Sequence, residues 1–109
     1  RVETYDRTFY TLPVEQIFNK HIDVERSALV SVIINNKTIP VICCELKRRH
    51  RSKQKIKEEL VKLAGDYTVT KGLSAILFHK HLPVDPRHNA KIFREKLTVW
   101  AQQKAKRYW

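Results

Sequence analysis

Two apolar runs separated by a short polar turn constrain the fold of this chain more than any other feature. Residues 27–34 and 38–46 are rich in valine, isoleucine and leucine, and Asn35-Asn36-Lys37 between them is a turn signal. Branched apolar side chains favour extended backbone. The pattern therefore predicts an antiparallel β-hairpin made from these two runs.

Helical periodicity marks three further segments. Apolar residues recur three to five positions apart in residues 13–20, 52–64 and 89–104. Pro13 suits the first turn of the first helix, while Ser52 and Asn89 suit the N-cap positions of the other two. The expected buried faces are Val14, Ile17 and Phe18; Ile56, Leu60, Leu63 and Ala64; and Ile92, Phe93, Leu97, Trp100 and Ala101.

Extended backbone is expected in two more places. Residues 1–11 favour a short hairpin around Asp6-Arg7, and residues 73–79 form an almost continuous apolar run that favours a central, buried strand. Together the elements predict an α+β fold: a small three-stranded sheet plus an N-terminal hairpin, covered by about three helices. A chain of 109 residues fits one domain.

The charge balance predicts an anionic partner. The chain has 22 Lys plus Arg against 11 Asp plus Glu, a formal net charge of +11, and residues 47–57 hold seven of the cations and no acid. Nucleic acid, nucleotide phosphate, an acidic protein surface and anionic lipid all remain open. No base-reading strand, KH loop or zinc finger accompanies the basic run, so we do not expect nucleic acid as the partner.

The cysteines and histidines predict no metal site. Cys43 and Cys44 are adjacent on an expected strand, so they should face opposite sides of the sheet and both stay reduced. No C-x-x-C motif is present, and His79 and His81 share a side without a third ligand nearby. For His21, an imidazolium at a helix C-terminus is expected to serve as a cap.

The chain shows no sign of a membrane or secretory address. No apolar run approaches the roughly 18 residues that a membrane span needs. The N-terminus has no signal-peptide pattern. We therefore expect a cytoplasmic protein without a membrane span.

The segment with most chemical promise runs from Pro83 to Leu97. It places Lys91 between a loop with two prolines and an amphipathic run, where a mobile cation could reach a reacting anion. By spacing alone, Lys91 would be an ordinary solvated lysine. The segment, however, resembles the closing motif of the adenylate-forming ligases, which include acyl- and aryl-CoA synthetases, peptide-synthetase adenylation domains and luciferases.

The resemblance covers nearly the whole chain. Residues 10–18 are similar to the family's helix that begins at Pro-x-Glu, and residues 27–32 are similar to its first core strand. Residues 84–97 look most like the branch of β-lactone synthetases of olefin biosynthesis and the peptide-synthase-like ligases close to them. The wider family has glycine where this chain has Ala90, so the motif departs from the superfamily while matching this branch.

The resemblance implies a function for the chain. Residues 1–109 would be the mobile C-terminal lid subdomain of a longer AMP-forming acid ligase, with Lys91 as the catalytic residue and Arg87 and His88 as possible contacts to substrate or nucleotide. Mg-ATP would be bound mainly by a large N-terminal domain outside this chain, a carboxylic or fatty acid would be the substrate, and the isolated fragment would be inactive. Thioester formation with CoA is disfavoured, because Arg7-Thr8-Phe9-Tyr10 stands where CoA-transferring members carry a glycine-containing loop.

Two other classes of function stay open beside the ligase. A freestanding basic module could hold nucleic acid or an acidic protein through residues 47–57. A purely structural or interaction domain is the third possibility. The start on an extended segment without a preceding cap suggests a piece of a longer protein, and the sequence upstream of Arg1 would decide most between these functions.

Overall fold

The central hairpin predicted from the sequence is confirmed. In the computed structural model, which describes residues 1–87 and 91–109, β3 (Val24–Ile34) pairs antiparallel with β4 (Lys37–Leu46), and Ile34 faces Lys37 across the turn. Asn35 and Asn36 have φ angles of 51° and 64°. A two-residue turn with both residues in the left-handed region matches the twist of the strands, and asparagine tolerates that region better than most residues.

The remaining elements confirm the α+β class. The N-terminal hairpin is formed by β1 (Val2–Glu3) and β2 (Thr8–Phe9). It is followed by helix α1 (Thr11–Phe18), and helix α2 (Lys53–Gly65) follows β4. β5 (Ile76–Phe78) and helix α3 (Arg94–Tyr108) complete the chain. Pro13 lies in the first turn of α1, and the Ser52 hydroxyl accepts the Lys55 backbone N–H at 3.2 Å, as an N-cap does.

The prediction of a central third strand was wrong. β5 has three residues and pairs in parallel with β4 alone, so the strand order is β3-β4-β5 and β4 is central in the described sheet. The apolar character of residues 73–79 has another cause than a central position in the sheet. Ile76 contributes to the core on one face of the sheet and Leu77 packs against the core on the other, so an edge strand is apolar on both sides.

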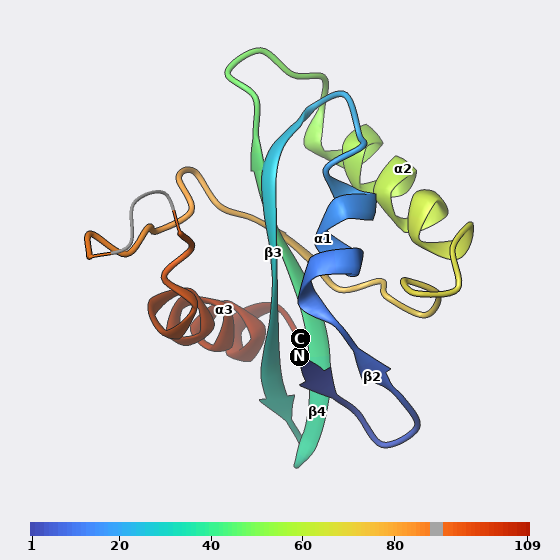
Figure 1. Ribbon diagram of the computed structural model, residues 1–109, viewed down its shortest axis with the longest axis vertical. Helices are drawn as coiled ribbons and strands as arrows, with labels where there is room; N and C mark the ends of the chain where they lie inside the picture. Colours follow the sequence, from blue (N-terminus) through green and yellow to red (C-terminus); the bar gives the residue numbers. More distant parts are fainter. Residues whose placement is uncertain (88–90) are drawn as a thin grey trace.

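The sheet is covered on both faces. Helices α1 and α2 and the N-terminal hairpin pack on one face, and α3 packs on the other (Figure 1). Cys44 belongs to the first core and Cys43 to the second, and both are buried free thiols, as the sequence predicts. Burial raises the pKa of the Cys43 thiol to about 12, which makes it a poor nucleophile.

The start of the last helix was also predicted wrongly. We expected α3 to begin at Asn89, which lies outside the described residues, but the helix begins at Arg94 and Phe93 occupies its N-cap position without a side-chain hydrogen bond. The helix starts late because the residues just before Arg94 are extended and pair with the other side of the loop. Ile92 forms an antiparallel bridge with Val84, and the Phe93 N–H donates to the Pro83 carbonyl at 2.8 Å. No helix among the described residues is long and apolar enough to cross a membrane.

Candidate functional site

Lys91 lies at the base of a loop whose two sides are joined by hydrogen bonds. The Asp85 N–H donates to the Lys91 carbonyl at 2.8 Å, next to the bridge between Val84 and Ile92. Lys91 therefore precedes α3 by three residues instead of lying in its first turn. Its backbone is held by pairing, which fixes where the side chain starts.

The Lys91 side chain is exposed. Within the described part of the chain, its amine makes no hydrogen bond or ion pair, although its charge adds to the hydrogen bonds from Arg87 that lower the pKa of Asp85. A flexible lysine on a fixed backbone can reach an anion outside the domain without losing a contact inside it.

Arg87 is occupied by Asp85. The Asp85 carboxylate accepts the Arg87 backbone N–H at 2.9 Å, Nε–H at 3.2 Å and Nη2–H at 3.1 Å. The side-chain and then the backbone hydrogen bonds from Arg87 hold the pKa of Asp85 below its usual value. Arg87 thus neutralises a nearly buried carboxylate, which weakens its candidacy as a substrate contact; the other candidate, His88, lies outside the described residues.

A polar clamp fastens the beginning of α3 to the rest of the domain. Arg94 donates through Nη1 and Nη2 to the two carboxylate oxygens of Glu15 at 2.8 and 3.0 Å, and through Nη1 to the Leu29 carbonyl at 3.1 Å. The Leu29 N–H donates to Glu15 at 2.7 Å. The clamp therefore joins α1, β3 and α3 immediately after the Lys91 segment.

The same clamp covers an open sheet edge. β3 is an edge strand, and the outward N–H and C=O of Leu29 are both taken up by Glu15 and Arg94. Gln102 does the same for Ile33, accepting its N–H at 2.8 Å and donating to its carbonyl at 3.0 Å. Edge groups satisfied by side chains cannot pair with a strand of another molecule. Nothing in the sequence indicated this clamp, because its two charges are 79 residues apart.

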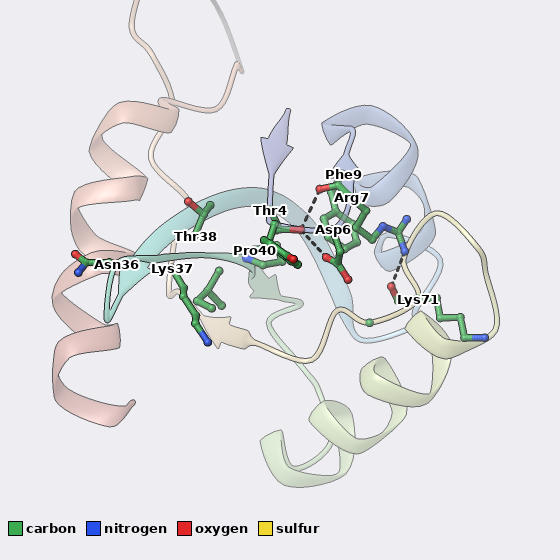
Figure 2. Close-up of a pocket in the computed structure, with 12 residues that line it drawn as sticks. Thr4, Asp6, Arg7, Phe9, Asn36, Lys37, Thr38, Pro40 and Lys71 are labelled. Atoms are coloured by element: carbon green, nitrogen blue, oxygen red, sulfur yellow. Dashed lines mark hydrogen bonds between the residues drawn. The ribbon is translucent and has the colours of Figure 1, made fainter.

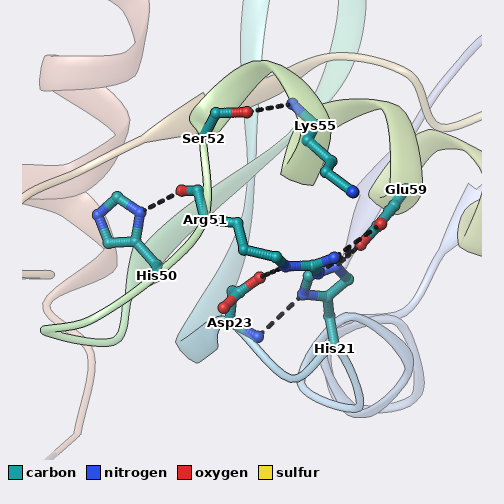
Figure 3. A network of polar contacts seen from close by, with 7 residues as sticks. All are labelled: His21, Asp23, His50, Arg51, Ser52, Lys55 and Glu59. Atoms are coloured by element: carbon teal, nitrogen blue, oxygen red, sulfur yellow. Dashed lines mark hydrogen bonds and ion pairs between the residues drawn. The ribbon is translucent and has the colours of Figure 1, made fainter.

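A second polar network ties the loop after α1 to α2 (Figure 3). Arg51 donates to Asp23 at 2.8 Å and to both Glu59 oxygens at 2.6 and 3.1 Å. His21 joins through Nε2 to Glu59 at 2.7 Å, while its Nδ1 accepts the Asp23 N–H at 3.0 Å. His21 therefore contacts Glu59 and the Asp23 backbone, while Asn19 occupies the C-cap position of α1 that the sequence suggested for His21.

This network predicts an acid-sensitive contribution to stability. Hydrogen bonds from Arg51 and then His21 lower the pKa of Glu59 from its usual 4.5 to about 2. A carboxylate with a lowered folded-state pKa stabilises the fold fully above 4.5 and loses that contribution as the pH falls to about 2. Glu59→Gln should therefore lower the urea midpoint clearly at pH 6 and much less at pH 2.5. Glu58→Gln, on the exposed side of the same helix, is the control; an equal loss for Glu59→Gln at both pH values would contradict the prediction.

A pocket of about 830 Å³ lies between the N-terminal hairpin and the turn end of β4 (Figure 2). Arg7 shapes one wall. Its guanidinium stacks 4.2 Å from the centre of the Phe9 ring and donates to the Lys71 and Thr68 carbonyls at 2.8 and 3.0 Å. Large side chains thus occupy this corner, as the sequence Arg7-Thr8-Phe9-Tyr10 indicates.

His79 and His81 form no metal site with other described residues. His79 Nδ1 accepts the His81 backbone N–H at 3.0 Å, and the His79 ring packs edge-on against Trp100 with centroids 4.4 Å apart. Across residues 1–87 and 91–109, no group of three histidine, cysteine or acidic side chains could hold a metal ion.

Comparison with known proteins relates this geometry to a family. An olefin β-lactone synthetase of Stenotrophomonas maltophilia is 46% identical over 101 residues, which are 93% of this chain and 18% of that protein. One of Xanthomonas campestris pv. campestris is 42% identical over 105 residues, 94% of this chain and 19% of that protein. The structure of an anthranilate CoA ligase with anthranoyl-AMP has a TM-score of 0.81 at 19% identity, over 96% of this chain and 20% of that one.

The chain matches the C-terminal part of the adenylate-forming ligases. No protein-family model matches it. The chain spans about a fifth of the length of the curated relatives that it matches. The resemblance expected from the three sequence motifs, including the branch of olefin β-lactone synthetases, is confirmed.

Proposed function

We propose that this chain is the mobile C-terminal lid subdomain of an ATP-dependent ligase that converts a carboxylic acid into an acyl adenylate, and that Lys91 is the residue it supplies to that step. One observation carries the proposal. Lys91 is an exposed amine on hydrogen-bonded backbone, in a chain that is 46% identical to part of an olefin β-lactone synthetase.

The chemistry of adenylation explains why a lysine is needed. The carboxylate attacks the α-phosphate of ATP and pyrophosphate leaves, so two anions have to meet in the transition state. An ammonium group between them offsets their repulsion and can donate to both oxygens. A large N-terminal domain outside this chain would bind Mg-ATP and the acid, and closure of the lid would bring Lys91 to the reacting atoms.

The product we propose is a β-lactone. The relatives are olefin β-lactone synthetases, and an acid with a hydroxyl on its β-carbon, such as a β-hydroxy fatty acid, could close this ring after activation. The hydroxyl oxygen would attack the carboxyl carbon, its proton would be lost to solvent, and the bond from the carboxyl carbon to the AMP oxygen would break so that AMP leaves. The large side chains of Arg7 and Phe9, at the position where CoA-transferring members of the family carry a glycine-containing loop, favour this route over a thioester. The two buried thiols fit the reducing cytoplasm.

The proposed function is tested on the longer polypeptide that contains this chain. We expect it to release pyrophosphate and AMP from Mg-ATP only when a carboxylic acid is added, with β-hydroxy fatty acids preferred over the same acids lacking the hydroxyl. Truncation before Arg1 should leave ATP binding intact and abolish adenylate formation, while residues 1–109 alone should be inactive. Acid-dependent pyrophosphate release that persists in the truncated protein would overturn the proposal.

A further inference from the structure

A basic pocket lies where β4 ends. Its volume is about 900 Å³, which is in the range of small-molecule sites. Four parts of the chain line it: Glu25 of β3, the end of β4 with the basic run that follows it, residues 78–81 from the last residue of β5 onward, and the middle of α3. Lys91 is not part of its wall.

The pocket concentrates positive charge in a concave place. Two carboxylates, Glu25 and Glu45, also line the pocket. Glu45 accepts the Leu82 N–H at 2.9 Å. The tertiary fold brings cations of the basic run together with cations from other parts of the chain. A basic run that served only as solvated surface would not need this arrangement. The lysine and arginine side chains of the wall are Lys47, Arg48, Lys53, Lys80 and Lys104.

Part of the lining is aromatic. The His79 and Trp100 rings contact each other with centroids 4.4 Å apart, and Trp100 lies under the Lys104 amine, which is 5.8 Å from the ring centre. Because His79 accepts the His81 N–H at Nδ1, its neutral ring carries the proton on Nε2 and can donate to a ligand oxygen. The lining therefore offers hydrogen-bond donors for an anionic group and an apolar surface for the organic part of the ligand that carries this group.

We propose that the basic pocket binds a phosphate group carried by a small organic molecule, with the lysine and arginine side chains on the phosphate and the aromatic part of the lining on the remainder. Phosphate suits the pocket because its three oxygens can accept from several cations at once. The proposal is independent of the catalytic role of Lys91.

The probes are phenyl phosphate and inorganic phosphate, which separate an organic phosphate from the free anion. Binding to the 109-residue chain is followed by Trp100 fluorescence after Trp109→Phe has removed the other tryptophan. Phenyl phosphate should bind saturably and at least about tenfold more tightly than inorganic phosphate, since aromatic contact adds to charge. Phenol, which lacks the charge, should not bind.

Matched charge reversals locate the site. Lys53→Glu and Arg48→Glu, both in the wall, should weaken phenyl phosphate binding about tenfold or more each. Lys55→Glu changes the net charge equally on the same helix but lies outside the pocket, so it should change binding less than about twofold. Equal weakening by Lys53→Glu and Lys55→Glu, in variants that melt like the parent, would show binding to the general surface charge and overturn the proposal. Preferential binding of single-stranded RNA, or phenol binding as well as phenyl phosphate, would overturn it too.

Discussion

Replacing Lys91 with alanine in the full-length ligase that we propose is expected to slow acyl-adenylate formation by roughly a thousandfold, with ATP binding and folding nearly intact. At about 4 Å and an effective dielectric constant of about 20, one charge–charge contact is on the order of 4 kcal/mol. If it forms only in the transition state, that energy corresponds to about a thousandfold in rate. Lys91 is exposed, so its removal leaves no cavity in the core.

Pyrophosphate release with an accepted acid measures this effect, and Lys96→Ala on the exposed side of α3 is the matched control. The control should retain wild-type rates. A Lys91→Ala rate within about twofold of wild type, less than about 0.5 kcal/mol, would exclude Lys91 from catalysis. If adenylate forms normally and only the next step fails, the contribution of the lid belongs to the second half-reaction, and residues 1–11 become the place to search.

Breaking the clamp between Arg94 and Glu15 is expected to have the second largest effect. Arg94→Met removes three hydrogen bonds, two to the Glu15 carboxylate and one to the Leu29 carbonyl on the free edge of β3. Hydrogen bonds to charged groups contribute about 1.5–3 kcal/mol each, so a loss of about 2 kcal/mol is expected after allowing for the partly exposed Arg94. Because α3 starts at Arg94, directly after the Lys91 segment, the full-length enzyme should also lose about tenfold or more in kcat.

A double-mutant cycle separates the clamp from unrelated effects. Urea unfolding of Arg94→Met, Glu15→Gln and the double variant should give a coupling free energy of about 1 kcal/mol or more. Arg107→Met, at the exposed end of the same helix, should change stability by less than about 0.5 kcal/mol. In the full-length enzyme, Arg94→Met should lower kcat while leaving the KM for ATP unchanged, and Arg94→Lys should restore part of the rate. Additive free energies, or a kcat equal to wild type, would contradict a positioning role.

The site was predictable only in part. The resemblance of residues 84–97 to a ligase motif singled out Lys91, and the exposure of this side chain agrees with a residue that acts outside its own domain. Arg87 was a reasonable candidate by charge, but its guanidinium donates hydrogen bonds to the carboxylate of Asp85, two residues earlier. Glu15 belongs to the Pro-x-Glu motif, but nothing in the sequence signalled that it pairs with Arg94, because the two residues are 79 positions apart.

The sequence by itself determined the elements that depend on neighbouring residues: the β3–β4 hairpin with its Asn35-Asn36 turn, the approximate helices, and the opposite facing of Cys43 and Cys44. These follow from the alternation of side chains along a strand and from helical periodicity, which the chain carries locally. Only the tertiary structure decided that β5 is an edge strand and that α3 begins at Arg94. It also decided that side chains from α1 and α3 form hydrogen bonds with the free edge of β3. Each of these depends on hydrogen-bond partners distant in the sequence, and such pairing is selected by the packing of the whole domain, not by any one segment.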